Sequence, residues 1–151
     1  MIKTPFVVLL AENDEHDIVA VKRAWKKRKI NNPLHIVNDG EECLDYLYQR
    51  GKYSEQGTAP RPGILLLDIN MPKMDGLAVL EHIRKSDEFH RLPVIILTTS
   101  KDEKDRLKSY DLRANAYIVK PIGFDNFSEA VNTINLFWEL VQLPEAYHEN
   151  K

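Results

Sequence analysis

Short apolar runs alternate with longer amphipathic stretches along the whole chain. The runs have the length of a strand, and the stretches between them repeat apolar residues every three to four positions, as a helix does. The five runs are Phe6 to Leu10, Leu34 to Val37, Ile64 to Leu67, Val94 to Leu97 and Ala116 to Val119. Strand and helix in alternation predict an α/β domain with a parallel sheet and right-handed crossovers.

The stretches between and after the runs predict five helices, each with one apolar face toward the sheet. The apolar positions of these faces are Ile18, Val21 and Trp25; Cys43, Leu44, Leu47 and Tyr48; Leu77, Leu80 and Ile83; Leu107 with Tyr110, the weakest set; and Phe124, Phe127, Val131, Ile134 and Trp138. Two boundaries support this pattern. Asp39-Gly40 is followed by two glutamates, as at a helix start, and Pro93 precedes the fourth strand.

Length and composition predict one domain. At 151 residues, with 43% hydrophobic and 29% charged residues, the chain can bury a single core. We expect a single domain over residues 1–151, with a core of about 5–143 and a tail of 144–151. A net charge of −2 argues against nucleic-acid binding. A single cysteine excludes a disulfide within the chain. No apolar segment suits a signal peptide or a membrane span, so we expect a cytoplasmic protein without nucleic-acid or membrane partners.

Asp68 is the most informative single residue, because it directly follows the apolar run Gly-Ile-Leu-Leu-Leu. Ligands of open α/β sheets bind at the carboxyl ends of the strands, where this carboxylate would lie. The first strand is followed by an acid-rich segment with Glu12, Asp14, Glu15 and Asp17, in which Asn13 separates Glu12 from Asp14. Carboxylates gathered there would repel one another unless a cation lay among them, and oxygen ligands favour Mg²⁺. The alternative is an acidic helix start with Asp14 as its cap.

The fourth and fifth strands end in a hydroxyl group and an amine. Thr98 could donate a hydrogen bond to a phosphoryl oxygen, whereas Thr99 and Ser100 better suit the cap of the following helix. Lys120 follows the fifth strand and places a positive charge where it could meet a phosphoryl group or Asp68. An acid pocket, a carboxylate, a hydroxyl group and a lysine on four strand ends favour phosphoryl chemistry.

With these residues in this order, the chain resembles the receiver domain of two-component response regulators over essentially its whole length. The matching residues are Glu12, Asp68 within Leu-Leu-Leu-Asp-Ile-Asn-Met-Pro, Met74-Asp75-Gly76, Thr98, Tyr117 and Lys120-Pro121. The resemblance implies a flavodoxin-like, doubly wound sheet of five parallel strands in the order 2-1-3-4-5. It also implies phosphoryl transfer from a histidine kinase to Asp68, a requirement for Mg²⁺, slow autodephosphorylation, and a switch formed by Thr98 and Tyr117. Tyr117 is equally consistent with an ordinary half-buried strand aromatic.

The resemblance also implies a set of ligands for the cation. These are Glu12, Asn13, Asp68 and the backbone carbonyl of Asn70, while Lys120 would offset charge on the transferred group. Most family members carry two adjacent acids after the first strand, but here the second position is Asn13. We therefore expect weaker Mg²⁺ binding and slower phosphoryl transfer than with aspartate at this position. The alternative is a degenerate receiver that acts as a phosphorylation-independent binding module.

The C-terminal sequence Phe-Trp-Glu-Leu-Val-Gln-Leu-Pro contains more apolar side chains than one helix face needs. We therefore expect Phe137, Trp138 and Val141 to form an interface, the alternative being a helix end that folds back over its own core. Together with the long loop before the central strand and the Leu-Thr-Thr-Ser segment, this ending resembles the single-domain regulators paired with cyanobacterial phytochromes. That resemblance implies a phytochrome-type sensor histidine kinase as phosphodonor, and a homodimer through the C-terminal part.

Two further function classes compete with a stand-alone phosphoacceptor that is not an enzyme. A phosphatase with an aspartyl nucleophile, as in enzymes of the haloacid-dehalogenase type, has a second aspartate two residues later. Asn70 stands at that position and cannot transfer protons. A flavodoxin-like ligand binder would need a glycine-rich phosphate loop, which the strand ends do not supply. The leading interpretation is therefore a phosphoacceptor that signals through protein contacts.

Overall fold

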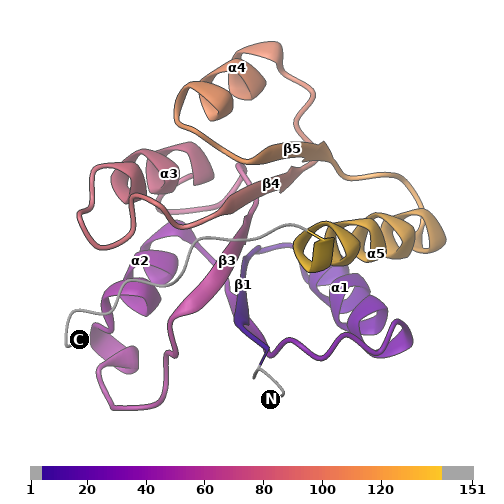
Figure 1. The fold of residues 1–151 in the computed structure, drawn as a ribbon. Helices are drawn as coiled ribbons and strands as arrows, with labels where there is room; N and C mark the ends of the chain where they lie inside the picture. Colours follow the sequence, from indigo (N-terminus) through magenta and orange to yellow (C-terminus); the bar gives the residue numbers. More distant parts are fainter. Residues whose placement is uncertain (1–4, 141–151) are drawn as a thin grey trace.

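The computed structural model describes residues 5–140, in which strands and helices alternate (Figure 1). The strands are β1 (Val7–Ala11), β2 (Leu34–Val37), β3 (Pro62–Leu67), β4 (Val94–Thr98) and β5 (Ala116–Val119). The helices are α1 (Glu15–Lys27), α2 (Gly40–Tyr48), α3 (Gly76–Arg84), α4 (Glu103–Asp111) and α5 (Phe124–Leu140), with a short 3₁₀ helix, η1 (Gly51–Tyr53). All five strands pair in parallel in the order β2-β1-β3-β4-β5, so the flavodoxin-like fold is confirmed. No helix within residues 5–140 is long and apolar enough to cross a membrane.

The sheet separates two hydrophobic cores, because successive side chains of a strand point to opposite faces. In β3, Leu65 and Leu67 pack with residues of α2 and α3, whereas Ile64 and Leu66 pack with residues of α1 and α5. Figure 1 shows α1 and α5 side by side on one face, with α2 and α3 on the other. Coverage on both faces explains why the runs are apolar at every position rather than at alternate ones.

Aspartate side chains cap the first four α-helices. Each accepts a hydrogen bond from a backbone N–H in the first turn, which satisfies a donor that the helix itself leaves unpaired. These caps are Asp14, Asp39, Asp75 and Asp102. The prediction that Thr99 and Ser100 cap the helix after β4 was wrong, since α4 begins later and Asp102 caps it. The Ser100 hydroxyl instead donates to Asp105 Oδ2 at 2.7 Å.

Helix α4 departs most from the expected pattern of burial. Leu107 and Tyr110 were expected to face the sheet, but they are 56% and 50% exposed. The buried residue of this helix is Ser109, whose hydroxyl is satisfied by the carbonyl of Asp105 at 2.7 Å. A small side chain therefore occupies the inner side of α4, and its two largest apolar side chains remain on the surface.

Trp138 belongs to the core, which corrects its assignment to an exposed interface. Its side chain is 4% exposed, and its ring lies 5.8 Å from Trp25 and 5.9 Å from Phe6. The indole Nε1 donates to Asn32 Oδ1 at 3.2 Å, while the Asn32 carbonyl accepts from Trp25 Nε1 at 2.7 Å. The hydrogen bond to Asn32 allows the Trp138 indole to be buried, because its N–H keeps a polar partner. The last turns of α5 therefore pack against α1 and cover this core.

Helix α5 leaves three other apolar side chains on the surface near its end. Leu136, Phe137 and Leu140 are 47%, 37% and 83% exposed. Because Leu140 follows Leu136 by four positions and Phe137 by three, these side chains lie on one side of the helix. We call these three residues the α5 stripe. Val141, the third residue of the expected interface, lies outside the described residues.

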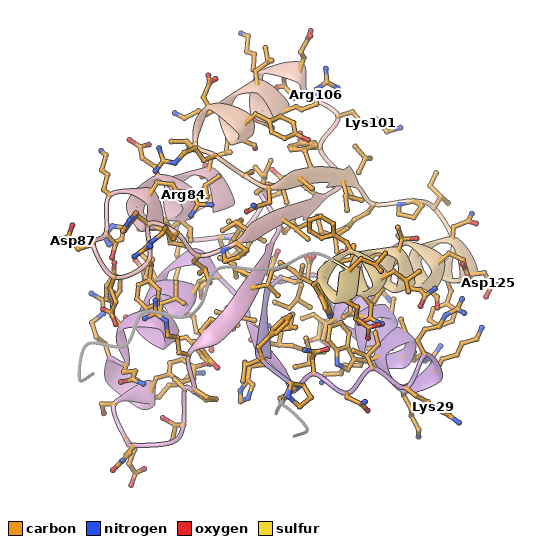
Figure 2. All side chains as sticks on the ribbon, in the orientation of Figure 1. Lys29, Arg84, Asp87, Lys101, Arg106 and Asp125 are labelled. Carbon is orange, nitrogen blue, oxygen red and sulfur yellow. The ribbon has the colours of Figure 1, made fainter. Side chains whose placement is uncertain are left out.

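Arg84, at the end of α3, joins two loops that are distant in sequence (labelled in Figure 2). Its guanidinium donates to the carbonyls of His90 and Leu92 before β4 at 3.0 and 2.8 Å. It also donates to the carbonyls of Leu112 and Arg113 before β5 at 3.0 and 2.9 Å. Burial, with the charge of Arg113, lowers the pKa of Arg84 to about 10, so the side chain stays protonated at neutral pH. Four carbonyl dipoles therefore hold this charge in place.

Candidate functional site

Three strands deliver charged side chains to the same end of the sheet. Glu12 follows β1, Asp68 follows β3, and Lys120 follows β5. Backbone hydrogen bonds fix these positions, since Asp68 N donates to Ala11 O at 3.1 Å and Lys120 N donates to Thr98 O at 2.7 Å. All three charged side chains are buried. The parallel sheet therefore brings together groups that are up to 108 residues apart in the chain.

The Lys120 ammonium lies among three carboxylates. Its Nζ is 2.6 Å from Glu12 Oε1, 2.8 Å from Asp17 Oδ2 and 3.3 Å from Asp68 Oδ2. An ammonium group has three hydrogens to donate, and each has a carboxylate partner here. Asp17, on the first turn of α1, was not among the site residues expected from the sequence. The only signal for it was its place in the acid-rich segment after the first strand.

Electrostatics in the site are set by burial and by these ion pairs. Burial raises the pKa of Glu12 to about 7, partly opposed by its hydrogen bond to Lys120, while the charge of Asp68 also raises it. Burial alone would lower the pKa of Lys120, but hydrogen bonds to Asp17 and Glu12 outweigh it and raise the pKa above its usual value. The lysine therefore stays protonated, and a single ammonium faces three acidic groups.

One carboxylate oxygen of Asp68 has no hydrogen-bond partner among the described residues. Oδ1 is buried and makes no hydrogen bond within the described part of the chain, whereas Oδ2 faces Lys120. A buried carboxylate oxygen without a partner is costly, which points to a ligand at this position. Asn13 directly follows Glu12, and Asn70 lies two residues after Asp68. Both asparagines are exposed and offer further oxygen atoms as ligands. Oxygen donors of this kind suit a hard divalent cation such as Mg²⁺.

The site is nevertheless not a preformed cluster of metal ligands. Among residues 5–140, no group of three or more His, Cys, Asp or Glu side chains is arranged to hold a metal ion. The Lys120 ammonium lies among the carboxylates of Glu12, Asp17 and Asp68 instead. A divalent cation would share Glu12 and Asp68 with the lysine and take further oxygens from Asn13 and Asn70.

Helix α3 begins directly against the backbone of Asp68. Gly76 N donates to Ile69 O at 2.8 Å, and a Cβ atom on Gly76 would lie 2.1 Å from Asp68 O. No side chain fits in that space, so glycine is required for this close approach. The Met74-Asp75-Gly76 segment thus returns the chain to the carboxylate and holds its backbone in place.

Thr98 and Tyr117 both contact the β4–α4 loop at Ser100. Thr98 is fully buried, and its Oγ1 accepts a hydrogen bond from Ser100 N at 3.2 Å. The half-buried Tyr117 donates its hydroxyl to Ser100 O at 2.9 Å. In the part of the chain that the structure describes, neither side chain is hydrogen-bonded to Asp68. The structure thus connects the two expected switch residues through Ser100, next to the site.

Comparison with known proteins identifies the family. The response regulator receiver domain family matches residues 8–132. Response regulator Rcp1 of Synechocystis sp. is 38% identical over 143 residues, which cover 94% of this chain and 95% of that protein.

Solved structures agree with this match. The Mn²⁺-bound form of Rcp1 aligns with a TM-score of 0.85 and 38% identity, covering 93% of this chain and 100% of the other. The phosphorylated cyanobacterial phytochrome response regulator RcpA aligns with a TM-score of 0.85 and 34% identity, covering 93% and 99%. The fold is thus shared with proteins that are similar in sequence along almost their whole length. This chain belongs to the response regulator receiver domain family of two-component signalling and is related to the phytochrome response regulators.

Proposed function

We propose that this chain is a stand-alone phosphoacceptor, in which Asp68 receives a phosphoryl group from the phosphohistidine of a sensor histidine kinase. The observation that carries the proposal is the buried, unpaired Oδ1 of Asp68 at the carboxyl edge of the sheet. Within residues 5–140 no hydrogen bond competes for this nucleophilic oxygen. The Lys120 ammonium lies 3.3 Å from the other carboxylate oxygen, Oδ2. A phosphorylated state in the cytoplasm would then signal through protein contacts.

The transfer is a single displacement at phosphorus. Oδ1 of Asp68 forms a bond to phosphorus as the bond from phosphorus to the histidine nitrogen breaks, and the bonding electron pair returns to the imidazole. Lys120 would stabilise negative charge on the phosphoryl oxygens, since it is protonated and buried. Mg²⁺, when bound by Glu12, Asp68, Asn13 and Asn70, supplies further positive charge. Hydrolysis of the acyl phosphate is slow, because Asn70 cannot act as a general base.

The related proteins support a phytochrome-type kinase as the donor. RcpA is a cyanobacterial phytochrome response regulator whose solved structure is phosphorylated, and it matches nearly all of this chain. A further solved relative, 36% identical with a TM-score of 0.85, is a response regulator in red light signaling of R. palustris. We infer that this chain likewise receives its phosphoryl group from a light-regulated sensor histidine kinase.

The β4–α4 loop offers a route from the phosphorylated site to the surface. A phosphoryl group on Asp68 could accept a hydrogen bond from the hydroxyl of Thr98, which now accepts from Ser100 N. The carbonyl of Ser100 also holds Tyr117, so a movement of Thr98 would release or reposition both. The exposed face of α4, including Leu107 and Tyr110, would then change its position relative to β5.

Incubation with acetyl phosphate and Mg²⁺, followed by intact mass measurement, tests the proposal. The wild type should gain one phosphoryl group and Asp68→Asn none, because the amide is not a nucleophile. Asp87→Asn is the matched control, since Asp87 is an exposed aspartate in the loop after α3 (labelled in Figure 2) and should leave labelling intact. Labelling that persists in Asp68→Asn contradicts the proposal. Hydrolysis of many equivalents of acetyl phosphate by the wild type would favour a phosphatase instead.

We also propose that the chain forms a homodimer through the α5 stripe. The stripe of Leu136, Phe137 and Leu140 exposes adjacent apolar surface that no residue within 5–140 covers. The double variant Leu136→Gln, Leu140→Gln should sediment as a monomer at concentrations where the wild type is a dimer. Both side chains are exposed, so the fold should persist.

A matched variant locates the interface. Leu107→Gln changes one leucine on α4 that is 56% exposed and should leave the dimer intact. Circular dichroism and the unfolding midpoint confirm that each variant is folded. The dimer proposal is contradicted if the wild type sediments as a monomer at every concentration, both before and after phosphorylation of Asp68.

A further inference from the structure

Only two of the acids that follow β1 reach the charged site. The side chain of Asp14 caps α1 by accepting from Asp17 N at 3.1 Å, and Glu15 is exposed. Glu12 and Asp17 turn toward Lys120, at 2.6 and 2.8 Å from its Nζ. The acid-rich segment therefore divides into helix-capping or surface acids and two acids that bind the lysine.

The position of Asp17 is fixed by the start of α1. Its backbone N–H is held by Asp14, so its side chain projects from the first turn of a helix that packs against α5. The carboxylate is 24% exposed, whereas the Lys120 side chain is 4% exposed. Asp17 is thus the partner of the lysine nearest to solvent, and Glu12 is the deeper one. The ammonium is therefore closer to Glu12 and Asp17, which lie just before and within the first turn of α1, than to Asp68. Its distance to Asp68 Oδ2 is the longest of the three, at 3.3 Å.

Asn13 makes the charge of Asp17 important. As a neutral and exposed residue, Asn13 adds no negative charge at the mouth of the site. Without Asp17, the ammonium would keep only Glu12 and Asp68 as anionic partners among the residues that the structure describes. It would then move toward the two carboxylates that a divalent cation also needs.

We propose that Asp17 is a positioning residue that holds the Lys120 ammonium away from Asp68, so that Asp68 stays accessible to a divalent cation and to the incoming phosphoryl group. The functional part of this inference rests on the proposed phosphoacceptor role of Asp68. The placement of the ammonium is a separate property of the unphosphorylated protein.

The test compares Asp17→Asn with Glu15→Gln. Both variants remove one acid from the first turn of α1, so they weaken the favourable charge at the helix start to a similar extent. Only Asp17→Asn removes a partner of Lys120. Asp17→Glu retains the charge and should restore most of the lost function, which a purely structural defect would not allow.

Three measurements are made on each variant. Calorimetric titration with Mg²⁺ alone should show roughly 10-fold weaker binding for Asp17→Asn, the effect expected when one charged hydrogen bond is lost. Phosphorylation by acetyl phosphate should slow by about 10-fold on the same argument, and Glu15→Gln should change neither quantity by more than about 2-fold. The ¹⁵N-detected ammonium signal of Lys120 should be protected from exchange in the wild type and in Glu15→Gln, and lost in Asp17→Asn.

The outcomes separate the two proposals. If the wild type does not accept a phosphoryl group, the phosphoacceptor role fails, while loss of the ammonium signal in Asp17→Asn still supports positioning by Asp17. If Asp17→Asn matches Glu15→Gln in Mg²⁺ affinity and in the ammonium signal, the positioning role is overturned, whatever the rate of phosphorylation.

Discussion

Lys120→Met is expected to lower the free energy of unfolding by about 3 kcal/mol at neutral pH in metal-free buffer, because it leaves buried carboxylates without their cation. Methionine is similar in length to lysine, so the cavity effect is small. Glu12 and Asp68 lose their contacts at 2.6 and 3.3 Å, and both are almost fully buried. Urea unfolding followed by tryptophan fluorescence measures the difference from the wild type.

Two conditions should reduce this loss of stability. A carboxyl group whose folded-state pKa is raised stabilises the fold at low pH and loses that contribution as the pH rises. The pKa of Glu12 is raised from 4.5 to about 7 even with Lys120 present, whose hydrogen bond and charge lower it. Loss of Lys120 should raise this pKa further, so the variant should approach the wild type as the pH falls toward about 7. Mg²⁺ should also restore stability, since a cation can replace the missing charge.

Lys101→Met is the matched control for the loss of a lysine. Lys101 is exposed in the β4–α4 loop (labelled in Figure 2), and its substitution should change the free energy of unfolding by less than about 0.5 kcal/mol. If Lys120→Met is as stable as the wild type in metal-free buffer at neutral pH, the ammonium does not compensate the buried acids.

Arg84→Met should strongly destabilise the fold at a position away from the site, lowering the free energy of unfolding by roughly 3 kcal/mol. The substitution removes four hydrogen bonds of 2.8–3.0 Å from one charged group to backbone carbonyls. Those carbonyls lie in the loops that precede β4 and β5, so the two loops lose their common anchor. Chemical unfolding measures the stability, and amide hydrogen exchange should rise in both loops.

Two variants separate the bonding geometry from the charge. Arg84→Lys keeps the charge but cannot span two loops with one ammonium, so it should recover less than half of the loss. Arg91→Met removes an exposed arginine before β4 and should be close to neutral. Full stability in Arg84→Lys would show that charge alone is sufficient, contrary to the expectation.

The sequence predicted the strands more accurately than it predicted the packing of helix α4. Five apolar runs predicted the strands to within two residues at either end, because a strand covered on both faces must be apolar throughout. The prediction for α4 was weaker, since Leu107 and Tyr110 are exposed and its buried residue is Ser109. Periodicity identified a helix there, but it could not identify which side packs against the sheet.

Trp138 shows the same limit at the C-terminal end. The helical stripe that runs from Phe124 assigned it to the core, while the surplus of apolar residues around it suggested an interface. Asn32, 106 residues earlier, accepts its indole hydrogen and resolves the conflict in favour of the core. The pattern of apolar residues around Trp138 carries no information about a hydrogen-bond partner that is so distant in the chain.

The amino-acid pattern was sufficient to predict the alternation of strands and helices, the parallel sheet and the strand ends that carry Glu12, Asp68 and Lys120. Those features depend on local periodicity and on the geometry of parallel strands, both of which are written along the chain. The three-dimensional structure was needed to show that Asp17 binds Lys120 and that one oxygen of Asp68 has no hydrogen-bond partner within residues 5–140. Contacts of this kind depend on which side chains meet across strands and helices after the two cores have formed.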